Sequence, residues 1–153
     1  MDTPRWLDDN EQRAWRAYLD ATRLLMAALD RQLVRDSGLS LTDYELLVAL
    51  SEAPGRRMRM SALADAVVTT RSGATRAIAR LVEAGLVRRV ECPEDKRGTL
   101  AELTDEGAAK LDAASPGHVE AVRSSMFDLL SAEDVTRFGD SFTAMRKHLL
   151  GNG

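Results

Sequence analysis

The segment 61–103 constrains the fold most, because its hydrophobic pattern changes from helical to strand-like at a single glycine, Gly85. Two short helical runs, 61–67 and 72–84, precede this glycine, which occupies the usual position after a helix C-terminus. Between the runs stands Val68-Thr69-Thr70, and three β-branched residues together fit a turn better than a helix interior. Two short helices at such a spacing are typical of a helix-turn-helix.

Two runs with strand periodicity follow Gly85 and predict a β-hairpin. The runs cover 86–90 and 99–103, and the charged segment 92–98 lies between them. A helix-turn-helix followed directly by a hairpin is a winged helix. Because both ends of the chain have helical patterns, we predict a mainly α fold with a small two- to three-stranded β wing.

The two ends of the chain carry apolar stripes at helical spacing. Helices are expected over 11–34, over 105–129 with a break or kink at Ser115-Pro116-Gly117, and from Ser131 onward. The last helix is expected to bury Val135, Phe138, Phe142, Met145 and Leu149.

These stripes are larger than one small winged helix could cover. They therefore predict contact with a second copy of the chain, and burial within one subunit is the alternative. We expect residues 1–35 and 105–153 to form a helical dimerisation region. Residues 36–104 are expected to form the winged helix-turn-helix, and the two regions to make a single intertwined domain.

The positive charge of the chain is concentrated in its middle. The 153 residues carry a net charge of −3, but residues 55–99 alone carry ten basic and five acidic groups. A basic segment between acidic flanks is the pattern of a localised polyanion site, and chance clustering is the alternative. Aromatic residues make up only 5% of the chain, which argues against a stacking platform for single-stranded nucleic acid.

The helical run 72–84 has one apolar face and one small polar face. Ser72, Arg76 and Arg80 lie opposite the apolar face, with no bulky apolar group among them. A helix that enters the major groove needs such a surface, because its backbone must approach closely and its guanidinium groups must reach base edges or phosphates. The alternative is a solvated face on which Arg80 pairs with Glu83.

The expected hairpin tip carries two basic residues, Lys96 and Arg97, next to Asp95. A basic side chain at the end of a projecting β-ribbon can enter the narrow, electronegative minor groove. Asp95 cannot favour DNA by its charge, so we expect it to hold Arg97 in one orientation. An ordinary solvated turn is the alternative.

Several of these segments together resemble the MarR family of bacterial transcriptional regulators, and the resemblance covers nearly the whole chain. The wing segment Pro93-Glu94-Asp95-Lys96-Arg97 is similar to the family's Asp-Pro-x-Asp-Arg-Arg signature, with Cys92 in place of the first Asp and Lys96 in place of an Arg. The other matching segments are Ser61-Ala62-Leu63-Ala64, Thr70-Arg71-Ser72-Gly73-Ala74-Thr75-Arg76, Leu81-Val82-Glu83-Ala84-Gly85-Leu86-Val87 and Leu103-Thr104-Asp105-Glu106-Gly107.

The resemblance implies a homodimer in which each subunit presents one winged helix to a half-site of a pseudo-palindromic duplex. Arg76, Ser72 and Thr75 would contact base edges, whereas Arg80 and Thr70 would hold phosphates. The complete set of expected DNA contacts is Thr70, Arg71, Ser72, Gly73, Thr75, Arg76, Arg80, Lys96 and Arg97. We expect a sequence-specific regulator of double-stranded DNA, a repressor relieved by a small ligand. The main alternative is a winged helix that binds an acidic protein partner without specific DNA binding.

The family resemblance also implies a small aromatic or phenolic effector. Trp15, Arg16, Tyr18 and Tyr44 are expected to line its cleft, with Arg16 pairing with a carboxylate. Trp15 and Tyr18 as plain core residues are the alternative. The two histidines, His118 and His148, are expected on helix surfaces rather than at a ligand.

The chain lacks the sequence motifs of other functional classes. The chain has no glycine-rich phosphate loop, no metal-ligand spacing and no nucleophile–base signature, so we expect neither an enzyme nor a bound cofactor. Because it has no apolar run long enough to cross a membrane, we expect no membrane span, and the residues at its start lead us to expect no signal peptide. Its one cysteine, Cys92, suits the cytoplasm, and we expect a sluggish thiol because Glu91 and Glu94 stand beside it.

Overall fold

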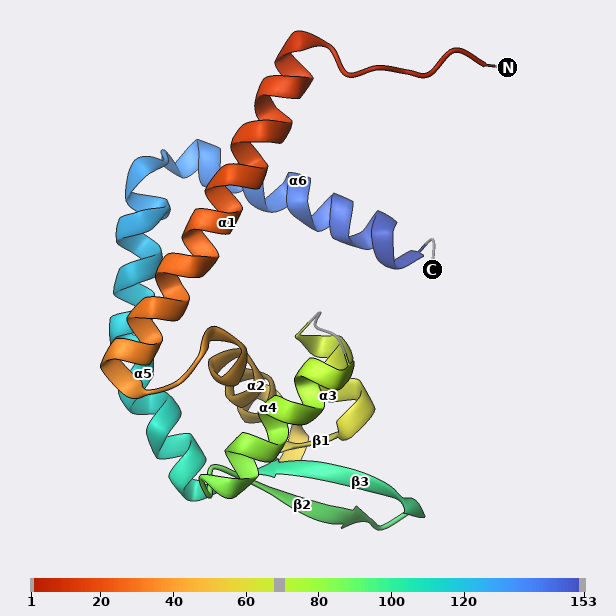
Figure 1. Cartoon of the computed structure of the whole chain (residues 1–153), viewed down its shortest axis with the longest axis vertical. Helices are drawn as coiled ribbons and strands as arrows, with labels where there is room; N and C mark the ends of the chain where they lie inside the picture. The colour runs from red at the N-terminus through yellow and green to blue at the C-terminus, as the bar shows by residue number, and fades with distance from the viewer. Residues whose placement is uncertain (1, 68–70, 152–153) are drawn as a thin grey trace.

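The computed structural model of the chain describes residues 2–67 and 71–151, so the expected turn at 68–70 lies outside the described residues. The described residues form a mainly helical protein with a small sheet (Figure 1). Its elements are α1 (Asp9–Ser37), α2 (Leu41–Glu52), the 3-10 helix η1 (Pro54–Arg56), β1 (Arg57–Arg59), α3 (Met60–Ala66), α4 (Arg71–Glu83), β2 (Val87–Cys92), β3 (Asp95–Leu103), α5 (Asp105–Ser125), the 3-10 helix η2 (Phe127–Leu129) and α6 (Ala132–Gly151).

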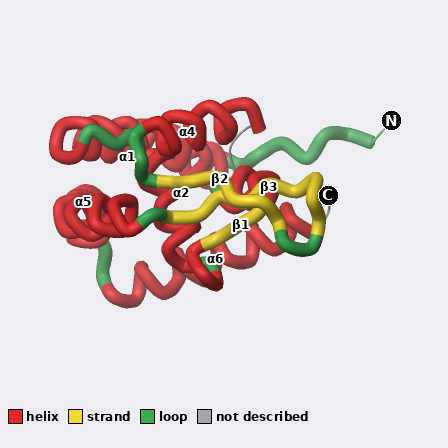
Figure 2. The backbone as a smooth tube through the Cα atoms, turned by 90° about the horizontal axis from the view of Figure 1, so that it is seen from below, coloured by secondary structure: helices red, strands yellow, loops and turns green. Residues whose placement is uncertain are grey.

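The elements form a winged helix with long helical extensions. Helices α2, α3 and α4 and the sheet lie together at one end of the molecule, while α1 and α5 pack against each other and lead away from it (Figure 1). Strand β3 is the central strand and pairs antiparallel with β1 and with β2 (Figure 2). The prediction of a mainly α winged helix with a small β wing is therefore confirmed.

Strand β1 completes the sheet at a position that the sequence pattern did not identify. Its three residues pair with the end of β3, where Arg57 lies opposite Glu102 and Arg59 opposite Leu100. A strand of three residues is too short to show an alternating pattern. Its pairing partner also lies more than 40 residues further along the chain, so no local signal marks it.

The core lies between the three winged-helix helices, the sheet and the lower parts of α1 and α5. It is built largely of leucines from α1, α2 and α3, and α4 contributes smaller side chains. Its most deeply buried members are Leu33, Leu46, Leu47, Leu50, Leu63, Ala77, Ile78, Val87 and Ala101. Burial of Ala74, Ala77, Ile78 and Leu81 confirms the apolar face predicted for α4.

Helix α5 runs through Pro116, so a break at Ser115-Pro116-Gly117 is wrong, whereas the alternative of a kink there stays a prediction. The helix is held on both sides of the proline by other contacts. The hydroxyl of Ser115 donates to the carbonyl oxygen of Leu111 at 2.8 Å, and α1 packs along α5 beside Gly117. Packing against a neighbouring helix thus compensates for the backbone hydrogen bond that proline cannot make.

The expectation that α6 is buried is wrong for the chain by itself. None of the described residues of α6 is buried, and Phe138, Met145 and Leu149 are 41%, 51% and 73% exposed. The helix crosses the far end of the molecule, where it meets α1 through the rings of Tyr18 and Phe142, 5.6 Å apart (Figure 1). Much of its apolar stripe is left uncovered.

The start of α5 fits against the turn after α4 only because residue 107 is glycine. A Cβ atom at Gly107 would overlap the carbonyl oxygen of Leu86, whereas one at Gly117 would lie 3.5 Å from the side-chain nitrogen of Gln32, an ordinary contact. We expect Gly107→Ala to lower the free energy of unfolding by about 3 kcal/mol. Gly117→Ala, in the same helix, should raise it by up to about 1 kcal/mol. Urea unfolding followed by circular dichroism measures both, and equal effects would contradict this packing.

Candidate nucleic-acid interface

Helix α4 turns its polar side chains outward because its small apolar residues face the core. Thr75, Arg76, Ala79 and Arg80 are exposed, as the pattern predicted. Arg76 has no ion-pair partner within the described part of the chain. An exposed face of small residues with a guanidinium is the surface that a major-groove helix requires.

Arg80 differs from Arg76 because it contacts a carboxylate on another helix. Its Nη2 atom lies 3.1 Å from Oδ1 of Asp43, a largely buried side chain in the first turn of α2. The partner is therefore Asp43 rather than Glu83, the alternative considered from the sequence. Arg80 ties α4 to α2, and its contact with a phosphate stays a prediction.

Glu102 in the central strand forms ion pairs with two arginines of the sheet. Arg57 on β1 and Arg88 on β2 lie opposite Glu102 in the strand register, and both donate to its carboxylate. The bond from Arg88 Nε to Glu102 Oε1 is 2.6 Å. The hydrogen bonds from Arg88 and Arg57 hold the pKa of the Glu102 carboxyl below its ordinary value.

Two other arginines of the sheet, Arg59 and Arg89, have no ion-pair partner among the described residues. Both are exposed and both line a hollow of about 470 Å³ between α4 and the sheet, which we call the basic hollow. Its lining consists of Arg59, Met60, Ser61, Thr75, Arg89, Gly98 and Thr99. The DNA contacts expected from the sequence did not include Arg59, Arg89, Ser61 or Thr99, although all four belong to the basic segment 55–99.

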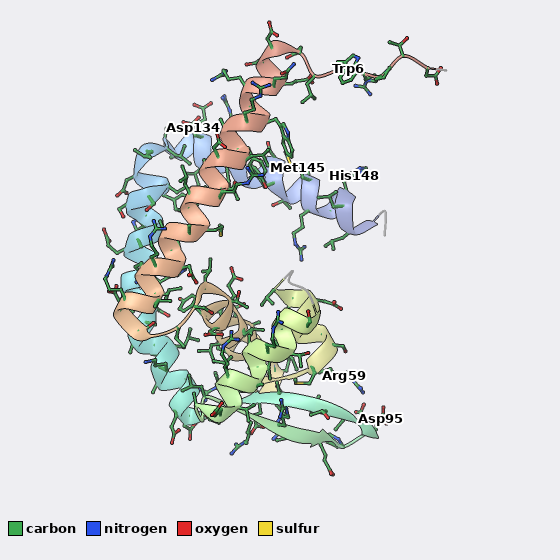
Figure 3. All side chains as sticks on the ribbon, viewed as in Figure 1. Trp6, Arg59, Asp95, Asp134, Met145 and His148 are labelled. Atoms are coloured by element: carbon green, nitrogen blue, oxygen red, sulfur yellow. The ribbon has the colours of Figure 1, made fainter. Side chains whose placement is uncertain are left out.

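Asp95 lies exposed at the tip of the hairpin, where Figure 3 labels it, and pairs with Cys92 across the turn. The side chains of Lys96 and Arg97, like that of Arg71 and the whole of Thr70, lie outside the described residues. The proposed orientation of Arg97 by Asp95 therefore stays a prediction. Cys92 itself is buried at the base of the tip.

The four residues expected to line an effector cleft are not brought together within one chain. Tyr44 lines a cleft of about 830 Å³ between α2, α3 and α5, with Glu45, Val48, Glu52, Val67 and His118 among its other lining residues. Trp15 and Tyr18 instead stack on each other nearer the start of α1, with ring centroids 5.9 Å apart. Arg16 donates to the side chain of Gln12 at 3.3 Å.

His118 belongs to this Tyr44 cleft, although the sequence placed it on a helix surface. Its ring centroid lies 4.4 Å from that of Tyr44, whose hydroxyl is 3.0 Å from Oγ of Ser115. The Nδ1 atom of His118 is buried with no hydrogen-bond partner among the described residues. Burial lowers the pKa of His118 and raises that of Glu45.

Comparison with known proteins identifies the family. The model of the MarR family matches residues 37–98. The fold is similar to that of Sco3205, a MarR family transcriptional regulator from Streptomyces coelicolor solved in complex with DNA. That similarity has a TM-score of 0.92 and 48% identity over 97% of this chain and 93% of that one. The chain belongs to the MarR family of transcriptional regulators.

Two further similar proteins support this assignment. AbsC, a MarR family transcriptional regulator from Streptomyces coelicolor, has a TM-score of 0.89 and 43% identity over 97% of this chain and 99% of its own. The transcriptional repressor YetL of Bacillus subtilis is 32% identical over 108 residues, which are 69% of this chain and 65% of YetL. Within the described residues, no helix is both long and apolar enough to cross a membrane.

The lowered pKa of His118 predicts a specific response to acid. Because the folded chain binds this proton less well than the unfolded chain does, the contribution of His118 is fully present above the unfolded pKa of about 6.5 and is lost as the pH falls below it. Urea unfolding at about pH 7.5 and pH 5.5 should show a smaller loss of stability for His118→Gln than for the wild type. Equal acid sensitivity of His118→Gln and the wild type would contradict the burial of His118.

Proposed function

We propose that this protein is a homodimeric, sequence-specific regulator of double-stranded DNA that acts in the bacterial cytoplasm. The observation that carries the proposal is the polar face of α4, where Arg76 stands exposed, together with the β2–β3 hairpin that follows this helix in the chain. In a winged helix this arrangement presents one element to the major groove and another to the adjacent minor groove. The similar protein Sco3205 was solved in complex with DNA, which supports the same use of this surface.

The uncovered stripe on α6 supports a second copy of the chain as the dimer partner. Exposed apolar side chains lie on α1 and α6, the helices that extend beyond the winged helix in Figure 1. They include Trp15, Tyr18, Met26, Phe138, Met145, Leu149 and Leu150. A patch of this kind marks an interface, and a dimer about a twofold axis would place two winged helices for the two half-sites of an operator.

The Tyr44 cleft supports relief of repression by a small ligand. It lies against α2, and α2 holds Arg80 of the DNA-facing helix through Asp43. A bound aromatic or phenolic molecule would contact the ring of Tyr44 and the unpaired nitrogen of His118. The three other residues expected at the cleft, Trp15, Arg16 and Tyr18, lie nearer the start of α1. They would reach such a cleft only from a second subunit.

Arg76 should contribute base specificity. Arg76→Ala is expected to cost about 1–3 kcal/mol on a duplex selected from a random library, and to relax base preference at one position of each half-site. Fluorescence anisotropy against the selected duplex and its single-base variants measures both effects. Arg35→Ala removes the same charge in the last turn of α1 and should change neither. If the wild type shows no salt-sensitive binding to any duplex, the protein-binding alternative replaces this function.

The chain should form a dimer in solution through α1 and α6. Phe138→Asp introduces a charge into the uncovered stripe, so it should shift sedimentation at micromolar concentration from dimer toward monomer. DNA affinity should fall with it, because one subunit can occupy only one half-site. A stable, well-folded wild-type monomer at this concentration would rule out the proposed assembly.

A further inference from the structure

The arginines around α4 and the sheet fall into two groups. Arg57, Arg80 and Arg88 are held by the carboxylates of Glu102 and Asp43, so their charge is offset and several of their donors are occupied. Arg59 and Arg89 are exposed and have no carboxylate partner in the part of the chain that the structure describes. Among the sheet arginines whose side chains the structure describes, these two are therefore the ones prepared to bind an anion from outside.

The two unpaired arginines meet in one place. They lie on the two edge strands, β1 and β2, and yet both line the basic hollow over the central strand. The hydroxyls of Ser61 and Thr75 come from α3 and α4, and that of Thr99 from β3. Guanidinium groups and hydroxyls are the side-chain donors that contact phosphate oxygens in protein–DNA interfaces.

Gly98 leaves room for one of these guanidinium groups. A Cβ atom at this position would lie 3.0 Å from Nη1 of Arg59 and 3.2 Å from Cβ of Cys92. Arg59 therefore rests directly against β3, on the side of the molecule where Asp95 marks the hairpin tip (Figure 3). Any side chain at position 98 would compete for the space that Arg59 occupies.

The position of the hollow matches the path of the DNA backbone. If α4 occupies a major groove and the hairpin reaches the next minor groove, the sugar–phosphate strand that separates the two grooves must pass between them. The basic hollow lies in that gap, because its walls are α4 on one side and the sheet on the other.

We propose that the basic hollow binds one backbone phosphate of the DNA through Arg59 and Arg89. The inference rests on the proposed DNA-binding function and adds a contact that fixes the position of α4 relative to the hairpin. Because the ligand is a phosphodiester, the contact contributes affinity and salt dependence without base preference.

The test is a salt titration of the full-length protein on its selected duplex. Each phosphate contact contributes about 0.9 to the steepness with which log K falls against log salt, and a dimer would make two such contacts, one in each hollow. The double variant Arg59→Gln/Arg89→Gln should therefore reduce this steepness by about 1.8, and each single variant should reduce it by part of that amount. Both single variants should lose affinity equally for the selected duplex and for a scrambled one. Thermal unfolding should match wild type, because neither side chain has an ion-pair partner among the described residues.

Arg88→Gln is the matched control, because residue 88 neighbours residue 89 on β2 but its guanidinium is bound to Glu102. It should leave the slope near that of wild type.

Two outcomes would overturn the proposal while DNA binding itself stands. The slopes of Arg59→Gln and Arg89→Gln could equal that of wild type, or Arg88→Gln could lower the slope as much as Arg89→Gln. The second outcome would mean that DNA responds to the summed charge of the sheet. Absence of salt-sensitive binding by the wild type would instead refute the proposed function.

Discussion

The joint between the end of α4 and the start of α5 determines how the two parts of this molecule are arranged. Gly85 takes a left-handed conformation with φ 77°, and the backbone N–H of Leu86 donates to the carbonyl oxygen of Leu81 at 2.9 Å. Thr104 then donates two hydrogen bonds to this turn. Its hydroxyl donates to the carbonyl oxygen of Gly85, and its backbone N–H donates to the carbonyl oxygen of Leu86. Gly107 closes the joint by packing on the same carbonyl group of Leu86. A rigid connection of this kind lets the long helix α5 fix the orientation of the DNA-facing helix.

Buried carboxylates determine which arginines of the winged helix remain available to bind an anion. Glu102 and Asp43 are both largely buried, and each removes guanidinium charge from the surface around it. Arg76, Arg59 and Arg89 are not paired in this way within the described chain, and Arg59 and Arg89 line the basic hollow between α4 and the sheet. The net positive charge of the basic segment 55–99 is therefore less informative than the distribution of its charges. The carboxylate of Glu102 on the central strand offsets part of this positive charge.

The sequence predicted the features that depend on neighbouring residues. The helix-turn-helix, the hairpin and the inward face of α4 follow from local periodicity and from Gly85, and all agree with the structure. Features that join distant segments were not predictable in this way. The Arg80–Asp43 pair spans 37 positions, and the basic hollow combines residues from β1, α3, α4, β2 and β3. The continuity of α5 through Pro116 depends on packing against α1, which no local rule describes.

Helix α6 has little of its own subunit to pack against. A helix of 20 residues with none of them buried in its own subunit gains little from tertiary packing, and isolated helices are only marginally stable in water. Whatever covers its apolar stripe therefore supplies much of its stability by mass action. If the cover is a second copy, a newly made chain at low abundance is partly unfolded at this end and exposed to proteolysis. Cellular abundance would then set both the occupancy of DNA and the lifetime of the protein.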